Sequence, residues 1–452
     1  MFISWAVALA SYIWACAPGA SAQTGAASTA PPTATPPPAS PAPALRGERP
    51  NEPPVLTRHP LNHRDWTVVI NLRLIGCQPK LPGAAVDPLQ TRRVSFDSAT
   101  MFFPLTATSA SHDNWDDRVT GKWEIDGRML APTPRLLTGY QSGTRLGAWD
   151  AAAANGNALQ LSLEIPMTSF ETRIDETRAV RIAWPTTPWP DDIASALMPQ
   201  LMVESQSPQV RLLLERWMRQ APGGPEPRNT PPYSLAKYLA GRAAAHYQPQ
   251  SNAVASTGRG QNSLRYSGAL LSGFAVDGAA VAAERGRGPV LDMANLLVAV
   301  YRAAGIPARL VIGHDNRVQD DRVNEKQRAT LVANVRAWAE FYLYDEHHNR
   351  GEWIPVDVQR QREFSSRPPP LAQRWQFFGH HEDLDYMQPL AFHWIPPTIC
   401  MNIGPPALWG WLPKPESAVA DPDLRVVVRA ASRRGDDPKR ATPGPGGAAR
   451  PE

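Results

Sequence analysis

The run VLDMANLLVAVYRAAGIPARLVIG, residues 290–313, restricts the possible folds more than any other part of the chain. Its first part, from about 290 to 304, is apolar nearly all round, which is typical of a helix buried on every side. Gly305 ends this helix as a C-cap, and Pro307 prevents its continuation. Residues 308–313 then read as a buried strand. A buried helix and strand need other elements around them, so we expect a mixed α and β fold.

Strand patterns dominate the part of the chain before residue 205. Residues 66–76 are rich in β-branched side chains, and 158–165 alternate strictly between apolar and polar residues. Residues 179–184 alternate again, so each of the three segments predicts a strand. Several short strands separated by turns are typical of a β-sandwich. We therefore predict a β-rich N-terminal domain over residues 59–204.

Helical patterns begin near residue 207. Ser207 is a suitable N-cap, and Pro208 stands at the first helical position. A second helix is predicted over residues 234–247, before the buried helix described above. Strands are predicted at 331–344 and 353–356, after that helix. Helices followed by a sheet indicate an α+β domain.

Residues 1–22 read as a secretory signal peptide. An apolar run is followed by small residues, and Ala20-Ser21-Ala22 is an A-x-A cleavage site. A membrane anchor and a lipid-attachment site at Cys16 are the alternatives, although the apolar run is short for a membrane span. No later run is apolar over a spanning length. We expect an exported protein, periplasmic or secreted, with no stable membrane span in its mature chain.

Two segments of low complexity flank the predicted domains. Residues 23–58 are rich in Ala, Pro, Thr and Ser, and residues 413–452 are rich in Arg, Pro, Gly and Ala. Such segments bury too little apolar surface to offset the entropy lost on ordering. We therefore expect a disordered linker and a disordered tail. The net charge of +4 is spread along the chain, and we predict no nucleic-acid partner.

Cysteine and histidine give no sign of a metal site. Cys77 and Cys400 remain after the signal peptide is removed, and they could form a disulfide or stay buried and reduced. No grouping of Cys and His has the spacing of zinc ligands, so we predict neither a metal nor another cofactor. The adjacent histidines at 347–348 and 380–381 both read as parts of surface loops.

Three blocks of the sequence resemble the transglutaminase-like superfamily, and they occur in the order found in that family. They are Leu296 to Gly313 with its Gly305-Ile306-Pro307-Ala308-Arg309 run, then Ala337-Trp338-Ala339-Glu340-Phe341 with Trp353-Ile354-Pro355-Val356-Asp357, and then Phe378-Gly379. The resemblance extends over about residues 205–395, with weaker support from residue 65, and it predicts a transglutaminase-like domain over residues 205–400. It implies an α+β fold in which a papain-like or transglutaminase-like core follows a β-sandwich-like N-terminal domain.

The resemblance also implies which positions carried the family's chemistry. The family uses a cysteine at the start of a buried helix, a histidine on a neighbouring strand and an aspartate on the next strand. Those positions are Val290, Arg336 and Asp357 here. Valine has no nucleophilic atom, and arginine stays protonated, so it cannot be a general base near neutral pH. Two of three roles are empty, which predicts an inactive relative.

The altered positions suggest what replaced the chemistry. We predict that Arg336 pairs with Asp357, because a buried carboxylate without a partner is costly. This pair could be a structural repair or an anion-binding site. Trp338, Trp353 and Asp292 are candidates for a ligand cleft, although such aromatic side chains are also ordinary core residues.

Other polar residues could replace the lost base or nucleophile. His314 is one candidate base, but we expect its side chain to face a loop. Ser267, Ser272 and Thr330 have no predicted base beside them.

Three functional hypotheses follow. In the first, the protein is an exported, non-catalytic transglutaminase-like protein that binds a protein, a peptide or an envelope polymer. In the second, it is an active amidase or acyltransferase of the superfamily with a rearranged site. In the third, it is a structural envelope protein in which the β-rich domain matters most.

Overall fold

The chain divides into two units, Met1–Glu52 and Pro53–Glu452, and only the second contains described residues. The predicted signal peptide, all three cysteines, and Ser267, Ser272 and Thr330 lie outside the described residues. The computed structural model describes residues 53–76, 93–106, 108–115, 118–138, 144–250, 276–316, 335–365, 367–395, 407–415 and 419–430.

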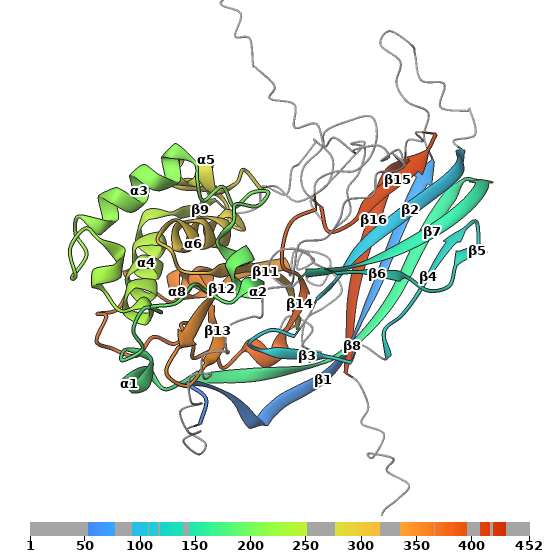
Figure 1. Ribbon diagram of the computed structural model, residues 1–452. Helices are drawn as coiled ribbons and strands as arrows, with labels where there is room; N and C mark the ends of the chain where they lie inside the picture. Colours follow the sequence, from blue (N-terminus) through green and yellow to red (C-terminus); the bar gives the residue numbers. More distant parts are fainter. Residues whose placement is uncertain are drawn as a thin grey trace, which may run out of the picture. The chain divides into compact units, whose positions relative to one another are not determined.

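Two antiparallel sheets form the β-rich region (Figure 1). The first has the order β16-β1-β8-β4-β5, with β3 also paired to β8, and the second has the order β15-β2-β7-β6. The strands of the first sheet are β1 (Leu56–Gly76), β3 (His112–Asn114), β4 (Thr120–Ile125), β5 (Arg128–Ala131), β8 (Ala158–Ile174) and β16 (Val419–Ala430). Those of the second are β2 (Val94–Thr106), β6 (Arg135–Leu137), β7 (Thr144–Gly156) and β15 (Gly410–Lys414).

The alternating pattern of β8 is confirmed. Leu159, Leu161, Leu163 and Ile165 are all buried in the core, as expected for one face of a half-buried strand. The strand predicted over 179–184 is wrong. A short helix, α1 (Glu176–Ala179), ends there instead, because the Asp175 side chain caps it by accepting a bond from the backbone N–H of Arg178.

The second half of the described chain packs helices against a sheet of order β13-β12-β11-β14 (Figure 1). Its strands are β11 (Ala308–Asp315), β12 (Val335–Asp345), β13 (Arg350–Val356) and β14 (Met387–Ala391), and a parallel pair is formed by β9 (Gln248–Gln250) and β10 (Arg287–Pro289). The helices are α2 (Asp191–Ala194), η3 (Ser195–Leu197), α3 (Pro208–Met218), η4 (Pro227–Asn229), α4 (Pro232–His246), α5 (Ala279–Arg285), α6 (Asp292–Ala303), α8 (Val358–Phe364) and η6 (Leu384–Tyr386).

Local signals explain where these helices begin and end. The Ser207 side chain accepts a hydrogen bond from the backbone N–H of Val210 and so caps α3, as predicted. Gly305 adopts a φ of +85°, which favours glycine, just after α6. The α6 helix is buried almost throughout, and Tyr301 near its end contacts Phe341 of β12 with a ring separation of 5.7 Å.

The C-terminal strands correct two predicted boundaries. The tail predicted over 413–452 is wrong in its first part, because β15 pairs with β2 and β16 pairs with β1. Leu424 and Val428 of β16 are buried, so this strand has an apolar face that the Arg and Pro content obscured. At the other end, β1 begins at Leu56, inside the linker predicted over 23–58.

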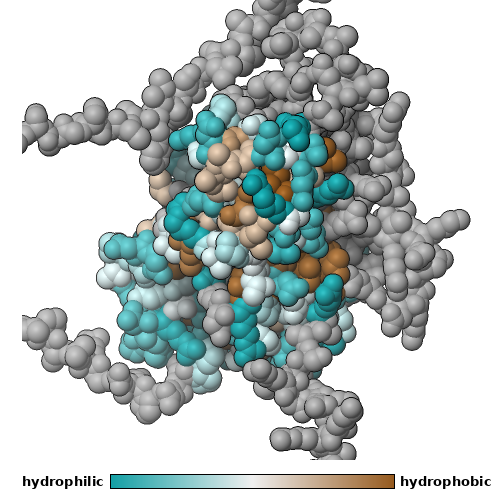
Figure 2. All heavy atoms as spheres, turned by 90° about the vertical axis from the view of Figure 1, so that its right-hand side faces the viewer, coloured by the Kyte–Doolittle hydropathy of each residue, from teal (hydrophilic) through white to brown (hydrophobic). Residues whose placement is uncertain are grey.

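The surface of the described residues is mainly polar on the side shown in Figure 2, with small apolar areas between hydrophilic ones. Large exposed apolar side chains of the β-rich region occur singly on separate strands, at Met129, Leu136, Leu412 and Val427. Scattered apolar side chains of this kind are normal on a folded protein. None of the helices within the described ranges is both long and apolar enough to cross a membrane.

Candidate functional site

Val290 lies in a turn directly before α6, partly buried and packed against the main hydrophobic core. Asp292 follows as the first residue of the helix and is fully buried. Its carboxylate accepts hydrogen bonds from the backbone N–H groups of Asp277 at 2.8 Å and Gly278 at 3.0 Å, and from the Asn295 amide at 2.9 Å. Asp292 therefore connects the segment at Asp277 and Gly278 to the start of α6. Because it is buried, the prediction that it lines a ligand cleft is wrong.

Arg336 and Asp357 come together, as the sequence predicted. The Arg336 guanidinium lies 3.8 Å from Asp357 Oδ1, and both residues are buried. The same guanidinium lies 3.6 Å from Asp315 and 3.5 Å from Glu363. One cation thus faces three carboxylates, which the sequence did not reveal. An approaching anion would be repelled by these carboxylates, so the arrangement favours the structural repair over the anion-binding site.

His381, which the sequence predicted to lie in a surface loop, contacts the second carboxylate oxygen of Asp357. His381 is only 1% exposed, and its Nε2 lies 3.3 Å from Asp357 Oδ2. The assignment is wrong because the His381 backbone pairs with Thr172 of β8 and its ring packs on Phe377. Asp357 Oδ1 also accepts the backbone N–H of Arg360 at 2.9 Å and caps α8.

The other histidines that the sequence singled out are either buried or exposed. His380 is buried as well, and burial together with nearby cations lowers its pKa to about 4. His314 is buried on β11 and does not face a loop, and burial lowers its pKa to about 4. A histidine with such a pKa is neutral near pH 7. His347 and His348 lie exposed in the turn after β12, as predicted.

The two tryptophans proposed for a ligand cleft differ in exposure. Trp338 is fully buried in a small cluster with Val311, Leu384, Met387 and Phe392, so it is a core residue. Trp353 is only partly buried, and the Arg309 guanidinium lies 4.2 Å from the centre of its ring. Within the described part of the chain, no three His, Cys, Asp or Glu side chains are grouped so that they could hold a metal ion.

The buried carboxyl of Asp292 should make stability depend on pH. Burial raises its pKa from 3.8 to about 6, outweighing the hydrogen bonds that lower it. The folded protein therefore holds the proton more tightly than the unfolded chain, and this stabilisation is present below pH 3.8 and lost as the pH rises through about 6. Chemical unfolding of the native protein and of Asp292→Asn is measured from about pH 4 to about pH 7. Over this range the native protein should lose up to roughly 3 kcal/mol of unfolding free energy that the variant, which has no carboxyl group at this position, does not lose. Parallel pH profiles would contradict this.

Comparisons with known proteins concern the helical half of the chain above all. Residues 234–358 match the family model described as the Transglutaminase-like superfamily, which agrees with the predicted transglutaminase-like core. The β-rich region before that core is seen in the two antiparallel sheets. No curated protein gives a significant match.

Two solved structures align with parts of this chain at low sequence identity. A candidate cysteine protease from Cytophaga hutchinsonii aligns with a TM-score of 0.47 and 12% identity, over 84% of this chain and 93% of its own. A candidate protease from Parabacteroides distasonis aligns with a TM-score of 0.22 and 8% identity, over 68% of this chain and 63% of its own.

Proposed function

We propose that the transglutaminase-like domain of this protein is a binding module without thiol chemistry, in an exported protein that binds a peptide, another protein or an envelope polymer. The observation that carries the proposal is Arg336, which stands in the histidine position among three carboxylates. A protonated guanidinium cannot accept the proton of a nucleophile. Val290, in the cysteine position, has no nucleophilic atom either.

The contacts of Arg336 support a structural role for this residue. Asp357 is 1% exposed, and a carboxylate buried to that degree needs a cation or hydrogen-bond donors. Arg336, His381 and the backbone of α8 supply them together. The site that held a reacting histidine in the family thus becomes an ion cluster that stabilises the end of β13 and the start of α8.

One observation favours a second candidate, an enzyme with a rearranged site. His381 and Asp357 form a histidine–carboxylate pair like the one that activates a nucleophile in hydrolases. The burial of His381 argues against an enzyme with a rearranged site. Its Nδ1 is enclosed, and no described residue, such as a nucleophile, forms a hydrogen bond with it. A substrate could reach this ring only if the surrounding loop moved.

An activity measurement on the full chain tests the proposal. Amine incorporation into a glutamine-containing peptide and hydrolysis of the same peptide are measured for the native protein and for the double variant Val290→Cys, Arg336→His. We expect no product from the native protein and a rate that alkylation abolishes in the double variant. Each single variant should stay at background, because nucleophile and base act as a unit.

The native cysteines require a control, so the native protein is alkylated in parallel. A native rate that survives alkylation would overturn the proposal and favour the rearranged enzyme. In that case His381→Gln should abolish the rate, whereas His347→Gln, in the exposed turn, should leave it unchanged.

A further inference from the structure

Four partly exposed aromatic side chains gather where β12 ends and β13 begins. Tyr342 and Tyr344 lie on the same face of β12, and their nearly parallel rings have centres 6.4 Å apart. Trp353 of β13 pairs with Tyr342, at a ring separation of 5.1 Å. Trp189, from the segment before α2, lies 6.5 and 6.4 Å from the two tyrosine rings. We call these four side chains the aromatic surface.

A single carboxylate fixes the segment that carries Trp189. Glu346, in the turn after β12, accepts hydrogen bonds from the backbone N–H groups of Thr186 and Thr187, at 2.8 and 2.9 Å, and from both of their hydroxyl groups. These bonds, of which that from the Thr186 N–H has the largest effect, lower the pKa of Glu346 to about 2. The carboxylate therefore stays ionised near neutral pH. A surface that is fixed in this way loses less conformational freedom when it binds a partner.

The surroundings of the aromatic surface are acidic, although the whole chain has a net charge of +4. Residues 186–192 and 342–353 contain five carboxylates and one arginine, which gives a formal charge of −4 with His neutral. Two of the carboxylates, Asp191 and Asp192, closely follow Trp189 and are exposed. Burial raises the pKa of the Tyr342 hydroxyl, and the charge of Asp192 is the next cause. The Asp192 carboxylate therefore lies close to the aromatic surface.

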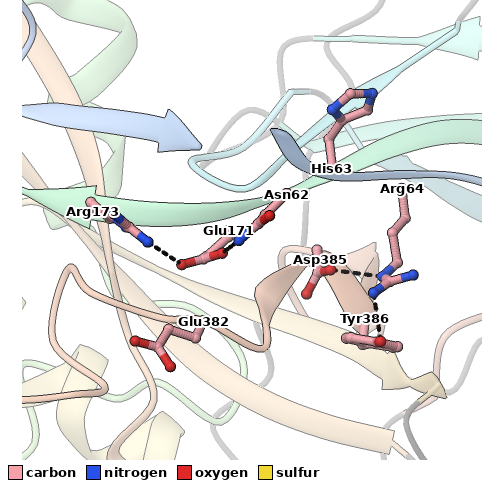
Figure 3. Close-up of a pocket in the computed structure, with 8 residues that line it drawn as sticks. All are labelled: Asn62, His63, Arg64, Glu171, Arg173, Glu382, Asp385 and Tyr386. Atoms are coloured by element: carbon pink, nitrogen blue, oxygen red, sulfur yellow. Dashed lines mark hydrogen bonds and ion pairs between the residues drawn. The ribbon is translucent and has the colours of Figure 1, made fainter. Parts of the chain in front are cut away.

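These two aspartates lack the cations that other acidic groups of the protein have. In the polar cavity between β1, β8 and the loop with η6, Arg64 binds Asp385 at 2.7 Å, and Arg173 lies 3.3 Å from Glu171 (Figure 3). Charges in that cavity are thus paired with one another. The described residues provide no ion-pair partner for the carboxylates of residues 191–192. Positive charge is therefore the complement that the aromatic surface lacks.

We propose that the aromatic surface binds arginine side chains of a basic peptide or protein segment. A guanidinium is planar, so it can stack on a ring while its N–H groups donate to a neighbouring carboxylate. The core contains the same arrangement, because the Arg309 guanidinium lies 4.2 Å from the centre of the Trp353 ring and 2.7 Å from Glu340. No cation of the described part of the chain lies over the rings of Trp189 or the two tyrosines.

This inference deepens the proposed function, because it names the class of partner. It rests on the binding role proposed for the domain, and it does not depend on the absence of catalysis. The carboxylates that face Arg336 are Asp315, Asp357 and Glu363, and none of them belongs to the surroundings of the aromatic surface. Changes at the aromatic surface therefore leave the former catalytic positions intact.

Calorimetric titration of the full chain at low ionic strength tests the inference. The probes are three capped hexapeptides in which glycine alternates with arginine, with lysine, or with citrulline, a neutral analogue of arginine. We expect the arginine peptide to bind with a dissociation constant on the order of 0.1 mM. The lysine peptide should bind about threefold more weakly and the citrulline peptide at least about tenfold more weakly. A lysine or citrulline peptide that binds as tightly as the arginine peptide would overturn the inference.

Variants locate the binding. Asp191→Asn combined with Asp192→Asn should weaken binding of the arginine peptide about tenfold, and Trp189→Leu should weaken it about fivefold. Asp97→Asn on β2 and Phe364→Leu on α8 replace exposed residues elsewhere and are the matched controls, which should bind as the native protein does. The two aspartates are exposed and unpaired among the described residues, so their double variant gives an answer even if Trp189→Leu loosens its segment.

The proposed function and this inference can fail separately. Unchanged binding in the double aspartate variant would overturn the inference. An inactive native protein that does not bind the arginine peptide would contradict the inference alone. A native protein that forms product after alkylation, yet binds the arginine peptide through these aspartates, would contradict the proposed lack of catalysis alone.

Discussion

Replacing Glu340 by alanine should lower the free energy of unfolding by about 3–5 kcal/mol. Glu340 on β12 is fully buried, and the Arg309 side chain on β11 is 4% exposed. Arg309 Nε donates to Glu340 Oε2 at 2.8 Å, and a second guanidinium nitrogen lies 2.7 Å from the same oxygen. Removing the carboxylate would leave a charged guanidinium enclosed between the rings of Trp353 and Phe392, each 4.2 Å away.

Urea unfolding followed by tryptophan fluorescence measures this loss. The matched control is Glu164→Ala, an exposed glutamate on β8, which should change stability by no more than about 0.5 kcal/mol. Replacing both partners, Arg309→Met with Glu340→Met, should recover most of the lost stability, because no uncompensated charge then remains. A loss below about 1 kcal/mol in Glu340→Ala would mean that water reaches the pair.

Replacing Trp411 by alanine should cost about 3–5 kcal/mol, as for other large aromatic side chains in a core. Trp411 is fully buried on β15. Its ring contacts Trp123 of β4 and Phe96 of β2 edge to face, with centroid separations of 5.7 and 5.4 Å. Such contacts add stability beyond the buried area. The residue therefore joins the C-terminal part of the chain to both sheets.

The neighbouring residue offers a close control for Trp411. Leu412 points to the opposite side of the same strand and is 44% exposed, so Leu412→Ala should change stability by no more than about 0.5 kcal/mol. Thermal or chemical unfolding of both variants checks the pair. Equal small effects would mean that β15 is dispensable and that the segment behaves as the tail suggested by its composition.

Regular patterns along the sequence predicted much of the fold, and interrupted patterns did not. The helices α3, α4 and α6 follow apolar repeats that can be read directly, and Ser207 before α3 and Gly305 after α6 mark two of their ends. The strand β16 was missed because Asp421-Pro422-Asp423 stands inside it, and Pro in a strand usually marks an edge. That strand is at the edge of its sheet, where such residues are tolerated. At 179–184 the alternation was present, but a helix cap at Asp175 decided the local structure.

The sequence predicted residues of the candidate site only at the positions that correspond to the catalytic positions of the transglutaminase-like family. The pairing of Arg336 with Asp357 followed from charge and position. His381 could not be placed, because its burial results from a backbone bridge to Thr172, far away in the sequence. The additional carboxylates, Asp315 and Glu363, come from other elements for the same reason. Contacts of this kind depend on the tertiary fold and leave no local pattern.

The pairing of β1 with β16 has a consequence for how the protein folds. Trp66 of β1 pairs with Ala430 of β16, and in the sequence the whole helical core lies between these two strands. During synthesis β1 emerges long before its partner, and closing so long a loop slows folding. Before β16 has been synthesised, the unpaired edge of β1 is open to pairing with another chain. The first sheet can be completed only after the core has been made, so nascent chains should need protection from aggregation during that interval.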